Sequence, residues 1–69
     1  MKLTGKSADE TFEIVNWLIK HVGEIVPGFT NHGYGWSIHY NDINNTYNIR
    51  LYDELVDDET RILFALTCA

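Results

Sequence analysis

The sequence has few of the residues that usually reinforce small proteins. It contains one cysteine, Cys68, and one proline, Pro27, in 69 residues. A single cysteine excludes an intramolecular disulfide, and one cysteine with three scattered histidines matches no zinc-binding pattern, so we expect neither a metal site nor a cofactor. Since a domain of this size buries only about 60% of its unfolded surface, its core gives a narrow margin of stability. Pairing with a second copy would widen that margin, and we therefore expect a homodimer.

Basic residues and long apolar runs are also scarce. Five Lys and Arg stand against ten Asp and Glu, which gives a net charge of −5. Nucleic-acid and anionic-lipid surfaces are bound through clustered Lys and Arg, so we expect no direct nucleic-acid binding and no membrane contact. No stretch approaches the ~20 apolar residues of a membrane span, and the N-terminal segment lacks the apolar run of a secretory signal. We therefore expect a cytoplasmic protein.

The residues that are present favour a folded chain. Hydrophobic residues make up 45% and charged residues 22%, the balance of an ordinary globular domain, and we expect one domain over residues 1–69. Its first predicted element is a helix over residues 8–25. Ser7 and Glu10 have the spacing of a capping box, and Pro27 with Gly28 ends the helix. Apolar residues follow the helical spacing of three and four at Phe12, Val15, Leu18, Ile19, Val22, Ile25 and Val26.

After a loop over residues 28–33 the apolar period changes from 3.6 to 2, which is typical of strands. The alternation predicts strands over residues 34–40, 47–52 and 61–68, with polar segments between them. Residues 2–4 would add a short edge strand, supported by Leu3 alone. One antiparallel register brings the large strand residues to a single face, by pairing Tyr40 with Tyr47, Ile38 with Ile49, Trp36 with Leu51, and then Ile49 with Phe64. The same register pairs Tyr52 with Arg61 on the opposite face.

These elements predict an α+β domain in the order αβββ, with one N-terminal helix packed on a three-stranded antiparallel meander. In that register Cys68 falls on the core face, where it would act as a small hydrophobic side chain. The opposite face is expected to carry nine residues, which are Ser37, His39, Asn48, Arg50, Tyr52, Arg61, Leu63, Ala65 and Thr67. All of them except Ser37 and Thr67 are predicted to form an oligomer or ligand face.

This opposite face has two alternative roles. Leu63 and Ala65 would be covered if two chains packed sheet to sheet, as the expected homodimer requires; otherwise they are ordinary exposed apolar residues. Arg50 and Arg61 would present guanidinium groups to phosphate, and Tyr52 a ring to a base. The face therefore also suggests an oligomeric small-molecule binder that sequesters an anionic, nucleotide-type ligand.

Acidic residues gather at the start of the helix and again between the second and third predicted strands. Such groups steer a protein onto a basic surface, or they are merely a helix start and a solvated loop. Trp17 lies four residues from both Glu13 and His21, so it is either an exposed anchor for a partner or a cover over apolar surface. The predicted partner-binding residues are Glu13, Trp17, His21, Asp53, Glu54, Asp57, Asp58 and Glu59.

The sequence shows no grouping of residues that indicates catalysis. The histidines have no His-x-x-x-His spacing, and neither a phosphate-binding glycine loop nor a G-x-S-x-G motif is present. The leading hypothesis is a small acidic, non-enzymatic binding protein that docks on a basic surface of another protein. In size and charge the chain resembles, in type only, the small inhibitors and regulators that bacteriophages direct against host proteins, including defence systems.

Overall fold

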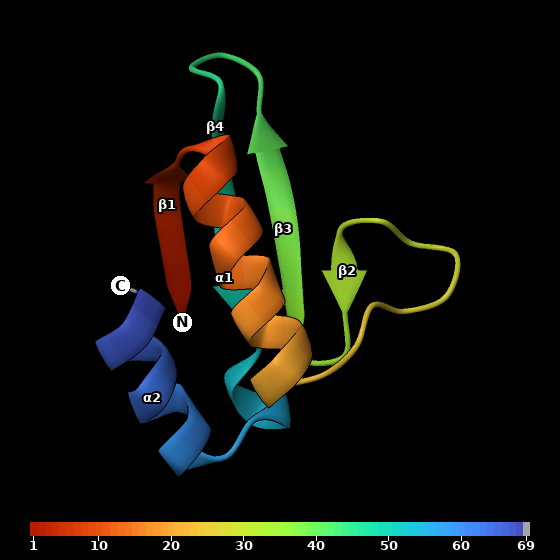
Figure 1. The fold of residues 1–69 in the computed structure, drawn as a ribbon, viewed down its shortest axis with the longest axis vertical. Coiled ribbons are helices and arrows are strands. Elements are labelled where there is room, and N and C mark those ends of the chain that lie inside the picture. The colour runs from red at the N-terminus through yellow and green to blue at the C-terminus, as the bar shows by residue number, and fades with distance from the viewer. Residues whose placement is uncertain (69) are drawn as a thin grey trace.

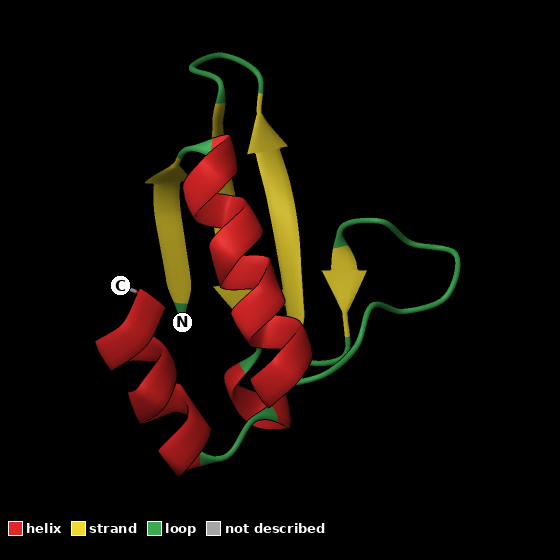
Figure 2. Cartoon of the chain, in the orientation of Figure 1, coloured by secondary structure: helices red, strands yellow, loops and turns green. Residues whose placement is uncertain are grey.

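The computed structural model describes residues 1–68 and builds them around a four-stranded antiparallel sheet with the strand order β1-β4-β3-β2 (Figure 1). Helix α1 lies across one face of this sheet, and α2 lies beside the end where β1 begins (Figure 2). The predicted α+β class is confirmed, although the element count differs. The elements are β1 (Lys2–Lys6), α1 (Ala8–His21), β2 (His32–Gly33), β3 (Trp36–Asn41), β4 (Thr46–Leu51), the short 3-10 helix η1 (Asp53–Leu55) and α2 (Asp58–Cys68).

The central hairpin has the register that the sequence predicted. Strands β3 and β4 pair Tyr40 with Tyr47, Ile38 with Ile49, and Trp36 with Leu51. Its turn is closed by local polar contacts, in which the Ile43 amide donates to the side-chain oxygen of Asn41 at 3.1 Å. Asn45 adopts a φ of 56°, a left-handed conformation that asparagine tolerates better than most residues. The first predicted strand begins at Trp36 rather than residue 34, because Tyr34 and Gly35 form the turn between β2 and β3.

The predicted third strand over residues 61–68 is wrong, because this segment forms the helix α2. Asp57 precedes the helix, and its carboxylate accepts a hydrogen bond from the Thr60 amide at 2.8 Å. This contact satisfies one of the free N–H groups at the helix start. The apolar residues at 62, 64, 66 and 68 fit a strand, but the run also contains Leu63 and Ala65 and fits a helix equally well.

The place expected for that third strand, beside β4, is taken by β1. Leu3 pairs with Ile49 and Lys6 with Tyr47, with an irregularity between the two pairs where Gly5 has a φ of 69°. The predicted pairs of Ile49 with Phe64 and of Tyr52 with Arg61 are therefore not formed. The edge strand that the sequence supported through Leu3 alone spans five residues.

Helix α1 begins as predicted and ends earlier. Ser7 and Glu10 form the reciprocal capping box, but the helix stops at His21 rather than residue 25. The chain then runs beside β2, where the Tyr34 amide donates to the carbonyl of Glu24 at 3.0 Å. The ring N–H of Trp36 donates to the Gly23 carbonyl at 2.8 Å. These contacts with residues distant in the sequence end the helix before Pro27 is reached.

The core lies between α1 and the sheet. Thr11, Ile14 and Leu18 form the buried side of α1, so the apolar stripe predicted through Phe12 is displaced around the helix, and Phe12 is 69% exposed. The predicted stripe also included residues 25 and 26, which lie beyond the end of the helix. The fully enclosed residues that complete the core are Trp36, Ile49, Leu51 and Phe64.

Candidate functional site

The sheet face that points away from α1 carries a row of polar side chains across all four strands. His32 of β2 pairs with Ser37 of β3, Ser37 pairs with Arg50 of β4, and Arg50 pairs with Lys2 of β1. Residues paired across antiparallel strands point to the same side of the sheet. We call this side the open face, because α1 covers the other side.

A hollow of about 220 Å³ lies on the open face. Two of its residues, Lys2 and Arg50, are basic, and among residues 1–68 no acidic residue lines it. The hollow is smaller than the 300–1,000 Å³ typical of drug-sized ligand sites. Its residues are Lys2, Ser37, His39, Asn48, Arg50 and Tyr52.

Contacts between side chains fix the centre of this hollow. The guanidinium carbon of Arg50 lies 4.9 Å from the ring centroid of Tyr52, within the range of a cation–π interaction. The Tyr52 hydroxyl and the Ser37 hydroxyl are 3.1 Å apart and share a hydrogen bond. The ring of His32 lies 6.3 Å from that of Tyr52. Arg50 is therefore held by a ring that is itself held by β3.

The open face contains part of the face predicted from the sequence. His39, Asn48, Arg50 and Tyr52 lie together as expected. Arg61, Leu63 and Ala65 do not join them, because they belong to α2. Ser37 lies on this face as predicted, although it was not among the predicted site residues. Lys2 and His32 also take part, and neither was predicted to lie on this face. The alternation of Lys2, Leu3 and Thr4 was the available signal for Lys2.

Arg61 has a different position from the one predicted for it. Its guanidinium donates to the carbonyl oxygens of Asp53 at 2.7 Å and Val56 at 3.1 Å, and it forms an ion pair with Asp58. The side chain therefore ties η1 to the first turn of α2. It does not project beside Arg50 toward a ligand.

A second exposed surface lies on the outer side of α2. Ile62 and Leu66 are 60% and 79% exposed, and their spacing of four residues puts them on one helix side. With Met1 and Ala65 they border a hollow of about 470 Å³, whose polar residues are Asp58 and Arg61. We call Ile62, Leu66, Ala65 and Met1 the α2 stripe. Leu63 is also exposed.

Asp58 borders the same hollow as the α2 stripe, and further acidic residues lie in the first turn of α2 and in the segment before it. Glu54 is in η1, Asp57 precedes α2, and Asp58 and Glu59 form its first turn. Hydrogen bonds from the side chain and amide of Thr60 hold the pKa of Asp57 below its usual range. The Asp53 carboxylate accepts a hydrogen bond from the Met1 amino group at 3.0 Å. The predicted acidic group thus lies at the start of a helix, where anions are favoured, and its side chains remain exposed.

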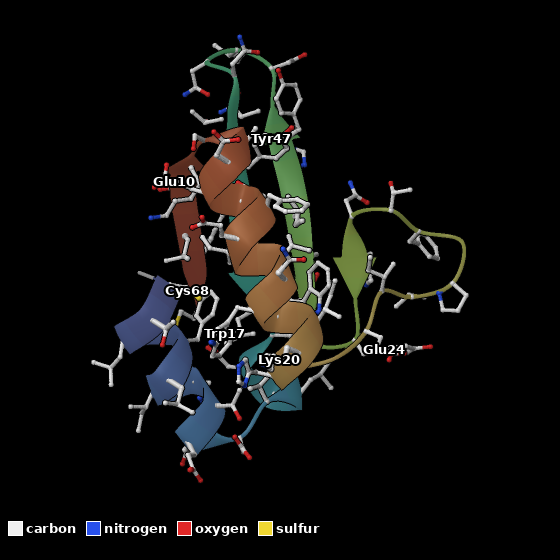
Figure 3. The ribbon with its side chains drawn as sticks, in the orientation of Figure 1. Glu10, Trp17, Lys20, Glu24, Tyr47 and Cys68 are labelled. Atoms are coloured by element: carbon white, nitrogen blue, oxygen red, sulfur yellow. The ribbon has the colours of Figure 1, made fainter. Side chains whose placement is uncertain are left out.

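Trp17 is not the exposed anchor that was one of its two predicted roles. It is half-buried against the core, with its ring 5.8 Å from Phe64 and 4.5 Å from His21. Figure 3 shows Trp17 on the side of α1 that faces α2. Glu13 borders the small groove beside it, together with Cys68. Burial raises the pKa of the Cys68 thiol, which disfavours the reactive thiolate.

No group of three or more His, Cys, Asp or Glu among residues 1–68 has an arrangement that could hold a metal ion. In the same part of the chain, no helix is long and apolar enough to cross a membrane. Comparison with protein-family models, with curated proteins and with solved structures finds no match to this chain.

Proposed function

We propose that this chain is a non-enzymatic binding protein that docks on another protein through the α2 stripe and the acidic residues beside it. The observation that carries the proposal is that one helix exposes Ile62 and Leu66 while its first turn holds Asp58 and Glu59. An amphipathic helix that lays an apolar side into a groove is a recurring mode of protein recognition. The matching surface is an apolar groove bordered by Lys and Arg.

Charge favours such a partner over a second copy of the chain. Each copy carries a net charge of −5, so two copies repel each other at long range, whereas a basic surface attracts them. The face that was expected to form the homodimer is not present, because Leu63 and Ala65 lie on α2 rather than on the sheet. The proposal places the chain in the cytoplasm as an inhibitor or regulator of phage type, which acts by occupying a site on a host protein.

The test compares two variants that each place one carboxylate on an exposed apolar position. Leu66→Asp changes the α2 stripe, and Phe12→Asp changes an exposed residue of α1, away from the stripe. Proteins captured from a host lysate by the wild type are identified, purified and titrated against all three chains. A partner that binds the wild type and Phe12→Asp, that binds Leu66→Asp at least about tenfold more weakly, and whose affinity falls with salt, supports the proposal.

Two results would overturn it. One is that the lysate yields no specific partner, or a partner that binds the wild type and Leu66→Asp with the same affinity. The other is a wild-type dimer at ~100 μM in light scattering that Leu66→Asp dissociates, since the stripe would then serve a second copy.

A further inference from the structure

Two basic side chains stand directly opposite each other on the open face. Lys2 of β1 pairs with Arg50 of β4, so both side chains leave the sheet on the same side. Like charges at directly opposed positions destabilise a sheet. The chain has ten acidic residues, yet among residues 1–68 none of them lines the hollow around this pair. An anion bound between the two side chains would remove the repulsion.

Arg50 is already oriented for such an anion. The Tyr52 ring lies 4.9 Å from its guanidinium carbon, and the Tyr52 hydroxyl shares a hydrogen bond with Ser37. A guanidinium group in a fixed position loses less conformational entropy when it binds a phosphate by two hydrogen bonds. Lys2 adds a second positive charge from the neighbouring strand.

The same hollow offers rings and amide groups. His39 is exposed beside the paired residue Asn48, and Tyr52 borders the hollow on the side of His32. Flat aromatic side chains stack on nucleobases, and an amide side chain both donates and accepts hydrogen bonds. Phosphate-binding and base-binding groups therefore lie within one small depression.

We propose that the open face binds one free nucleotide, with its phosphate between Lys2 and Arg50 and its base against the ring of His39 and the amide of Asn48, while Tyr52 holds Arg50 in place. Since the hollow of about 220 Å³ is smaller than a typical site for a ligand of this size, it takes the phosphate end, and part of the nucleotide remains exposed to solvent. A long polyanion is disfavoured, because the net charge of −5 repels phosphates outside the hollow. This site is separate from the α2 stripe and does not depend on docking there.

The experiment is calorimetric titration of the full chain with adenosine 5′-monophosphate, adenosine, inorganic phosphate and a ten-nucleotide oligoadenylate. The expected result is binding of the monophosphate at least about tenfold tighter than adenosine or phosphate, since of these three only the monophosphate reaches both the cations and the His39 ring. Arg50→Gln and Lys2→Gln should each weaken this binding about tenfold.

Lys20→Gln is the matched control, because it removes the same charge from the exposed last turn of α1 and should leave the affinity unchanged. Without ligand and at low salt, Lys2→Gln should also raise the melting temperature, since the repulsion with Arg50 is lost. This readout separates a lost ligand contact from a damaged fold.

Four results would overturn the proposal. The first is no heat of binding with the monophosphate at about 10 mM, a concentration above even a millimolar dissociation constant. The second is equal weakening by Lys20→Gln and Arg50→Gln. The third is equal affinity for phosphate and the monophosphate, which indicates an anion site without base recognition. The last is tight binding of the oligoadenylate alone, which assigns the face to single-stranded nucleic acid.

Discussion

The rings of Trp17 and Phe64 lie with their centroids 5.8 Å apart and tilted by 51°, which joins the two helices of the fold. Phe64 is the one residue of α2 that is buried. The rest of the helix contributes half-buried or exposed side chains. The packing of α2 on the core, and with it the proposed docking surface, therefore depends mainly on this aromatic side chain, with the half-buried Cys68 and the contacts of Arg61 to η1 beside it.

Phe64→Ala is expected to release α2. Removal of a buried Phe side chain costs about 3–5 kcal/mol, which is comparable to the whole stability of a domain this small. Circular dichroism during urea unfolding should show reduced helix content and a lower midpoint. Phe12→Ala is the control, because that ring is 69% exposed, and its effect should stay within about 0.5 kcal/mol. Equal midpoints for the two variants would contradict this role of Phe64.

Gly33→Ala is expected to disturb the packing of Trp36. A methyl group at Gly33 would lie 2.0 Å from a ring carbon of Trp36, so the ring must move, at a cost of about 1–3 kcal/mol. The measurements are the melting temperature and the tryptophan fluorescence. Gly28→Ala serves for comparison, since its Cβ meets nothing within 4 Å but its φ of 90° strains an alanine. Both variants should lose stability, and only Gly33→Ala should shift the emission.

The sequence predicted the central hairpin because its signal is redundant. Three cross-strand pairs, Trp36 with Leu51 among them, must all change faces if the register slips by one residue, and the structure has that register. The capping box of Ser7 and Glu10 was equally predictable, because it depends on neighbours in the chain. Its hydrogen bonds form within one helical turn.

The errors occurred where the local signal was ambiguous or where distant contacts decide. The apolar residues of 61–68 fit the period of a strand and that of a helix, and the deciding feature is the cap formed by Asp57. Asp57 lies in a segment that was predicted only as a polar break between strands. The early end of α1 follows from the contact of Trp36 with Gly23. The residues of the open face on β3 and β4 could be predicted from the alternation of the two strands. Lys2 lies on this face only because β1 pairs with β4.

Asp57 gives the stability of α2 a defined pH dependence. Its pKa is lowered in the folded state by the hydrogen bonds from Thr60, so the ionised carboxylate stabilises the fold. This contribution is present above the ordinary carboxyl pKa of about 4 and is lost as the pH falls through the lowered value. The melting temperature of the wild type should therefore fall on acidification below pH ~4.

The variant that checks this dependence is Asp57→Asn. Asparagine also caps helices but does not titrate, so its melting temperature should change less with pH than that of the wild type. Asp57→Ala should be less stable at neutral pH and should also lose the Asp57 part of the acid dependence. Glu10, whose pKa is lowered by Ser7, keeps its own contribution in all three proteins. Parallel curves for wild type and Asp57→Asn would show that the carboxylate charge of Asp57 is not involved.

Thr11→Val is expected to stabilise the protein. Thr11 is buried on the inner side of α1, and its hydroxyl oxygen has no hydrogen-bond partner within residues 1–68. A buried hydroxyl without a partner costs about 1–3 kcal/mol, and valine fills nearly the same space without that cost. Thr11→Ser retains the hydroxyl and removes the methyl group, so it should be less stable than the wild type. Thermal unfolding should rank the three as valine above threonine above serine, whereas a destabilised valine variant would mean that the hydroxyl makes a favourable contact.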